Sequence, residues 1–93
     1  MRDVVHQLLA TDIALDKLGA RDISAEEAVQ IIRNRHAVIR NPRSADPGSR
    51  RLLVGHTAGG RSLTLVVEET IEPTTWLIVT GWPSTAAERR IVG

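Results

Sequence analysis

The sequence predicts an α+β domain in which two amino-terminal helices pack on a three- to four-stranded antiparallel sheet, followed by a short carboxy-terminal helix. Three observations predict it. Short apolar, β-branched runs fill the stretch from Arg50 to Gly81, Gly and Pro signals separate them, and Ser/Thr-x-x-Glu capping boxes begin at Ser24 and Thr85. The 93 residues are enough for one domain, spanning residues 1–93.

The stretch 50–81 is expected to form an antiparallel meander. Its apolar runs cover residues 52–54, 63–67 and 76–80. Ala58-Gly59-Gly60 joins the first pair of runs and Ile71-Glu72-Pro73-Thr74 joins the second, which is typical of hairpin connections. A further β-like run, residues 36–40, precedes a loop at 42–49 that is rich in turn-forming residues.

Three helices are expected around this sheet. The spacing of Val4, Leu8, Leu15 and Leu18 predicts a helix over residues 3–18, or one that breaks near Thr11-Asp12. The Ser24 capping box predicts a second helix ending near residue 34. The Thr85 capping box predicts the third helix, with arginines near its end that complement the helix dipole.

Composition excludes several classes of protein. The chain has no cysteine, so disulfides and thiolate metal sites are impossible. No apolar run approaches the roughly 18 residues of a membrane span, and no signal-peptide pattern is present, so we expect a soluble cytoplasmic protein without membrane contact. His6, His36 and His56 lack metal-ligand spacing, and no nucleotide-binding fingerprint occurs, so we expect no metal and no cofactor.

Charge is concentrated in the middle of the chain. Residues 33–61 hold seven arginines and one acidic residue, whereas both flanking segments are net acidic. Arginine suits phosphate contacts, so Arg40, Arg43, Arg50 and Arg51 are expected to face RNA. The alternative is a solvated rim in an arginine-rich protein. His56 and Arg61 flank the glycine turn, where a histidine base and arginine cations could act on an RNA phosphate.

The order of short motifs resembles the BrnT-type toxins of the RelE-like group of bacterial toxin–antitoxin systems. The resemblance covers about residues 12–90. It is carried by the segments 17–19 (KLG), 23–28 (ISAEEA), 51–55 (RLLVG), 57–61 (TAGGR), 78–80 (IVT) and 88–90 (ERR). It implies helices packed on an antiparallel sheet and a metal-independent endoribonuclease that is inhibited by a DNA-binding antitoxin. The basic residues of the family correspond to Lys17, Arg61 and Arg89.

The chain departs from this pattern at several positions. Leu18 stands where the family usually has histidine, Trp82 where it has arginine, and Ile91 where it has tyrosine. Trp82 has two interpretations. It stacks on an unpaired base, which is worth about 1–3 kcal/mol, or it covers the edge of the core.

These observations leave three hypotheses for function. The first is a toxin that binds a cognate antitoxin and cuts RNA, with Arg61, His56, Lys17 and Arg89 as catalytic residues and Arg40, Arg43, Arg50, Arg51 and Trp82 as RNA-binding residues. The second is a non-catalytic module on the same fold that binds RNA or a protein. The third is a small homodimer, which the modest core of a 93-residue domain makes plausible.

Overall fold

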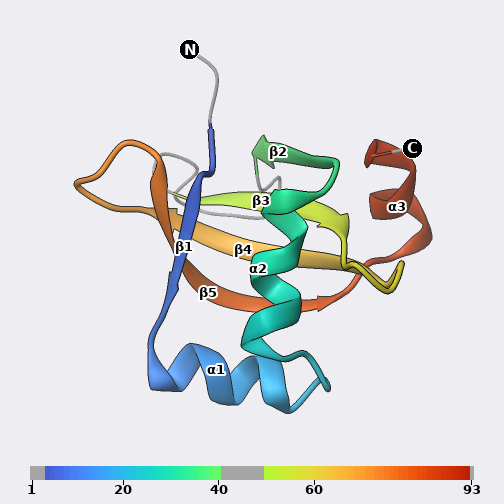
Figure 1. Ribbon diagram of the computed structural model, residues 1–93, viewed down its shortest axis with the longest axis horizontal. Helices are drawn as coiled ribbons and strands as arrows, with labels where there is room; N and C mark the ends of the chain where they lie inside the picture. Colours follow the sequence, from blue (N-terminus) through green and yellow to red (C-terminus); the bar gives the residue numbers. More distant parts are fainter. Residues whose placement is uncertain (1–3, 41–49, 93) are drawn as a thin grey trace.

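The computed structural model describes residues 4–40 and 50–92. These residues form an α+β fold with a five-stranded sheet in the order β1-β5-β4-β3-β2 (Figure 1). Along the chain, the elements are β1 (Gln7–Ala10), α1 (Asp12–Gly19), α2 (Ala25–Arg33), β2 (His36–Arg40), β3 (Arg50–His56), β4 (Ser62–Glu69), β5 (Thr75–Pro83) and α3 (Ala86–Val92).

The predicted meander is confirmed. β3, β4 and β5 pair in antiparallel order, with Leu53 opposite Leu65 and Val67 opposite Ile78. The apolar run at 36–40 is β2, which pairs antiparallel with β3. The second and third predicted helices are also present, and both capping boxes form, with Ser24 accepting from the Glu27 amide and Thr85 from the Glu88 amide.

The predicted helix over residues 3–18 is wrong in its first half. Residues 7–10 form β1, which pairs parallel to β5 with Gln7 opposite Thr75. Helix α1 begins only after Thr11, whose hydroxyl accepts from the Ala14 amide at 3.1 Å. Pairing with β5 overrides the helix propensity of this segment. The Trp76 indole adds to this pairing, since it donates to the Val4 carbonyl at 3.0 Å. The sheet is therefore mixed and five-stranded, not antiparallel with three to four strands.

Helices cover the two faces of the sheet differently. α1 and α2 pack on one face, where Leu18, Ile31, Leu53 and Leu65 are fully buried. We call this the α1/α2 face. The short helix α3 packs against β3 and β2 on the opposite face, because its Glu88 bonds Thr64, which alternates with Leu65 of the α1/α2 face; we call this opposite face the α3 face. Successive side chains on a strand alternate between these two faces.

Two glycines let the helices approach the sheet closely. A Cβ atom at Gly81 would lie 2.6 Å from Leu65 Cδ2 and 2.9 Å from Leu18 Cδ2. A Cβ atom at Gly55 would overlap Ile31 of α2. These contacts fix where α1 and α2 sit relative to the ends of β5 and β3.

Candidate functional site

The structure divides the predicted site residues between two ends of the sheet. We call the end where β3 and β5 finish and β2 and β4 begin the hairpin end, and the opposite end of β2 and β3 the far end. His56, Arg61 and Trp82 lie at the hairpin end. Arg40, Arg50 and Arg51 lie at the far end, about 20 Å away along β3 at about 3.3 Å per residue. Arg43 lies outside the described residues.

The described arginines of the far end differ in their exposure and partners. Arg50 pairs with Glu68 through Nε at 3.4 Å from Oε1. Arg51 is buried, with 8 % of its surface exposed, and its Nη1 donates to the Arg50 carbonyl at 2.8 Å. Arg40 is exposed at the end of β2. Arg50 thus has a carboxylate partner while its side chain is 44 % exposed, and Arg51 is buried; the expectation that both face RNA stays a prediction.

Arg61 connects the hairpin to the loop between α1 and α2. Its Nη1 lies 3.3 Å from Oε1 and 3.4 Å from Oε2 of Glu27 and also donates to the Asp22 carbonyl. Its Nη2 donates to the Arg21 carbonyl at 3.3 Å. Asp22 adopts a positive φ of 58°, which is uncommon for a residue other than glycine. Arg61 thus stabilises an unusual turn, and its guanidinium is already engaged.

Glu27 belongs to the same cluster. The Ser24 backbone N–H donates to Oε1 of Glu27 at 3.1 Å. This hydrogen bond is the largest cause that lowers the pKa of Glu27 below its usual value; slight burial opposes it, and Arg61 adds to the lowering. The carboxylate therefore stays charged and caps α2 while it holds Arg61.

Trp82 is half-buried at the end of β5, on the α3 face. Its Nε1 donates to Oε1 of Glu88 at 3.0 Å. The Arg21 guanidinium carbon lies 5.9 Å from the centre of the indole ring, at the outer range of a cation–π contact. The indole is therefore anchored at the edge of the core and has an exposed cation beside its ring.

Glu88 collects three donors on the same oxygen, Oε1. They come from Trp82, the Thr85 amide and the Thr64 hydroxyl, at 2.8 to 3.0 Å. Because the Thr64 hydroxyl has one hydrogen, the 2.8 Å contact between Thr64 and Ser84 must have Ser84 as donor. Burial raises the pKa of Glu88, but the hydrogen bonds from Thr85, Trp82 and Thr64 outweigh it, so the net pKa is lowered.

The two histidines of the hairpin end point to opposite faces. His36 is paired with Gly55, which faces α2, whereas His56 follows Gly55 and so lies on the α3 face. The Nδ1 of His36 lies 2.8 Å from the Asn34 carbonyl, so Nδ1 carries the hydrogen. Asn34 also donates through Nδ2 to the His56 carbonyl at 2.8 Å, which holds the end of β3 in place.

His56 shares the α3 face with Trp82. The register places His56 opposite Ser62 and Trp82 opposite Thr64, so all four side chains lie on this face of the sheet. Among the described residues, Ser62 has the only buried side-chain oxygen or nitrogen without a hydrogen-bond partner. His56 itself is half-buried, so its imidazole remains partly accessible.

Lys17 and Arg89 flank this end from the two helices. Lys17 precedes Leu18, which packs on Gly81, and Arg89 follows Glu88, which holds Trp82. Both cationic side chains are exposed. The structure thus places His56 and Trp82 on one face at the hairpin end, with Arg89 on the helix of that face, Lys17 on a helix of the other face, and Arg61 bonded to the loop between α1 and α2.

Several residues of this region were not singled out from the sequence. Arg21 and Asn34 carry no motif, and Glu88 was identified only as part of a helix cap. A strand-end tryptophan followed six residues later by a glutamate in a capping box is the signal that could have indicated the Trp82–Glu88 hydrogen bond. No group of three or more potential metal ligands occurs within residues 4–40 and 50–92.

The protein is thus a small α+β domain whose hairpin end carries the partly exposed His56 and Trp82, with the Arg21 guanidinium beside the indole ring. The chain belongs to the family described as "Domain of unknown function (DUF4258)", whose model matches residues 11–82. The matched region includes His56, Arg61 and Trp82 and stops before α3. Neither the curated proteins nor the solved structures contain a significant match. No helix of the described chain is long and apolar enough to cross a bilayer.

Proposed function

We propose that the hairpin end binds single-stranded RNA and cleaves it without a metal ion, and that the protein is the toxin of a toxin–antitoxin pair. One observation carries the proposal: His56 and Trp82 share the α3 face, the Arg21 guanidinium lies beside the Trp82 ring, and the exposed Arg89 belongs to α3, which packs on that face. Phosphate contacts supply most of the affinity of such a surface, and an aromatic ring adds stacking on a base.

The chemistry needs no protein nucleophile. The imidazole of His56 takes the proton of a ribose 2′-hydroxyl, and the 2′-oxygen attacks the adjacent phosphorus. The bond to the 5′-oxygen breaks, this oxygen takes a proton from water, and a 2′,3′-cyclic phosphate remains. Lys17, Arg21 and Arg89 stabilise the negative charge on the phosphate oxygens. Arg61, which was expected to be catalytic, is a positioning residue in this proposal because it holds the backbone of Arg21.

The test is cleavage of single-stranded RNA by the purified protein in EDTA. We expect products with 2′,3′-cyclic phosphate ends, and a rate reduced about 100-fold or more in His56→Ala, as for loss of a general base. The far-end variant Arg40→Ala is the matched control and should cleave like the wild type. Intact RNA with protein that is folded by circular dichroism would refute the catalytic proposal.

The toxin role has its own experiment. Induced expression of the wild-type chain in bacteria should arrest growth, and His56→Ala expressed to the same level should not. Coexpression of a small DNA-binding protein encoded by the adjacent reading frame should restore growth. Normal growth at high expression of the wild type would contradict this role, whatever the protein does to purified RNA.

A non-catalytic RNA-binding module is the second candidate. It is favoured by the engagement of Arg61 with Glu27 and of Trp82 with Glu88, since both residues already have structural partners. In this case the protein binds RNA with an affinity that falls steeply as salt increases, and the RNA stays intact. Cleavage measured beside binding in the same samples separates the two candidates.

A further inference from the structure

Strand β1 is an unprotected edge of the sheet. It is the last strand next to β5, so one side of its backbone has no neighbouring strand among residues 4–40 and 50–92. Its sequence, Gln7-Leu8-Leu9-Ala10, has no charge and no proline. Natural proteins usually protect such an edge with charges, proline or a bulge. The opposite edge strand, β2, does carry His36 and Arg40.

Several exposed apolar side chains belong to β1 and its neighbours along the chain. The exposed large apolar residues of the described chain are Val4, Leu9, Ile13, Leu15, Ile71 and Ile91. Val4 lies just before β1, Leu9 is in β1, and Ile13 and Leu15 are in α1. The side chains of Leu9 and Ile13 are 45 % and 69 % exposed. Exposed apolar groups on and next to an open edge strand favour an interaction with another chain.

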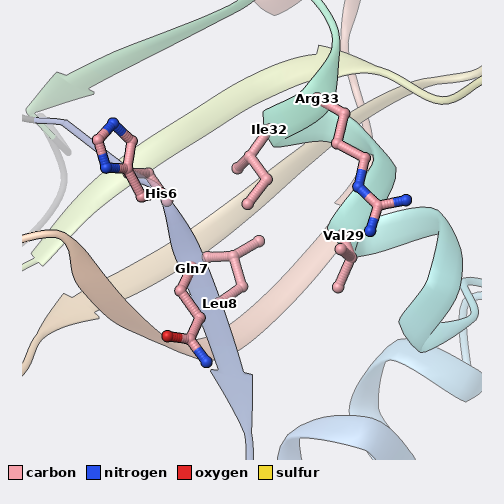
Figure 2. A pocket seen from close by; sticks show the side chains of 7 residues that line it. His6, Gln7, Leu8, Val29, Ile32 and Arg33 are labelled. Atoms are coloured by element: carbon pink, nitrogen blue, oxygen red, sulfur yellow. The ribbon is translucent and has the colours of Figure 1, made fainter.

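A groove runs beside β1 on the α1/α2 face. Its volume is about 420 Å³, and it lies between residues 5–8 and the second half of α2 (Figure 2). Leu8, Val29 and Ile32 supply its apolar lining, with His6 on the β1 side and Arg33 on the α2 side. The groove is next to the start of β5, the end of that strand opposite to Trp82.

Arg33 gives the lining of the groove a positive charge. His6 and Arg33 are its only ionisable lining residues, and both are exposed. The side chain of neither residue has a hydrogen bond or ion pair with another residue of the described chain. A ligand that is apolar in part and acidic in part therefore fits this lining.

We propose that β1 and this groove bind an extended acidic segment of a partner protein by strand addition. The segment hydrogen-bonds along the free edge of β1, places an apolar side chain against Leu8 and Ile32, and places a carboxylate beside Arg33. In this mode, main-chain hydrogen bonds give affinity and side-chain pockets give specificity.

A second copy of the chain fits the same edge less well. Residues 4–10 contain no acidic side chain, so pairing of β1 with β1 would leave Arg33 without a carboxylate from the added strand. The inference rests on this edge and not on the RNA-binding hairpin end, so either proposal can fail without the other.

The probe is a blocked nine-residue peptide that alternates valine and glutamate, and the control probe has lysine in place of glutamate. Backbone amide shifts of ¹⁵N-labelled protein are followed in low salt. We expect saturable shifts confined to β1 and residues 29–33 with the acidic peptide, and none with the lysine peptide. Shifts that are absent from β1, or equal for both peptides, would overturn the proposal.

Two charge reversals make the test specific. Arg33→Glu should weaken binding of the acidic peptide about tenfold or more, because it replaces an attractive contact by a repulsive one. Arg90→Glu, an exposed arginine of α3 outside the groove, should bind like the wild type. Equal affinity of all three proteins would refute the role of Arg33. Sedimentation showing a dimer whose formation shifts the β1 amides would assign the edge to a second copy and overturn the proposal.

Discussion

Arg61 and Glu27 form an ion pair that joins the β3–β4 hairpin to the first turn of α2. Nη1 of Arg61 lies 3.3 and 3.4 Å from the two carboxylate oxygens of Glu27, which is 34 residues earlier in the chain. The same guanidinium holds the carbonyls of Arg21 and Asp22. Arg61, which the sequence suggested as a catalytic residue, is thus also a tertiary connection that holds the backbone of Arg21.

Removal of this connection should destabilise the fold. Arg61→Ala is expected to lower the melting temperature clearly, and Arg61→Lys by less, because lysine keeps one charge but cannot bond Glu27 and both carbonyls together. Arg89→Ala, an exposed arginine, is the matched control and should stay within about 2–4 °C of the wild type. A melting temperature of Arg61→Ala equal to that of Arg89→Ala would contradict the structural role.

Stability should decrease in acid through Glu27 and Glu88. The folded protein holds the pKa of each carboxyl below its usual value of 4.5. Their stabilising contribution is therefore complete above that value and is lost as pH falls through the lowered folded pKa. Urea unfolding at several pH values from 7 to 3 measures this dependence. Glu88→Gln should unfold more easily at pH 7 and show a shallower decrease; an unchanged slope would contradict the assignment.

The close packing of α1 on β5 predicts a cost for any side chain at position 81. Gly81→Ala should lower the free energy of unfolding by about 1–3 kcal/mol, as for other overpacked cores, because its methyl group would meet Leu65 and Leu18. Gly19→Ala is the control, since a Cβ atom there has nothing within 4 Å. Denaturant titration of both variants gives the comparison, and a Gly81→Ala protein as stable as Gly19→Ala would show that the helix does not approach so closely.

The hydroxyl chain beneath α3 predicts a further cost. Thr64→Val keeps the shape of a fully buried side chain but removes the acceptor of the Ser84 hydroxyl and one donor to Glu88. A buried polar group left without a partner costs about 1–3 kcal/mol. Thr80→Val, a half-buried threonine of β5 without such a bond, should change stability much less. Equal effects in urea unfolding would contradict the stabilising role of these buried hydrogen bonds.

Local patterns predicted most of the fold because they match the local causes of structure. The meander follows from β-branched runs between turn signals, and α2 and α3 follow from capping boxes that do form. Strand β1 could not be predicted in this way. Its partner is β5, some 68 residues later, as the pairing of Gln7 with Thr75 shows, and residues 4–10 fit a helical period equally well.

The sequence identified residues of the candidate site, but it did not show which of them lie on the same face and at the same end of the sheet. His56 and Trp82 were identified from the chain, and the register then places both on the α3 face. The basic segment 33–61 suggested one cationic surface, but β3 separates Arg50 from His56 by its whole length. Arg61 shows the other limit, because its partners depend on the turn at Asp22, which no sequence pattern indicated.

Affinity for a labelled single-stranded RNA in low salt, measured by fluorescence anisotropy, tests the central claim most directly. The claim is that the hairpin end, and not the far end, contacts RNA. Arg21→Glu reverses the charge beside Trp82, and Arg40→Glu reverses an exposed charge at the far end. We expect Arg21→Glu to weaken binding about tenfold or more and to reduce its salt dependence, and Arg40→Glu to change it less than about threefold. The reverse order of the two variants would contradict the claim.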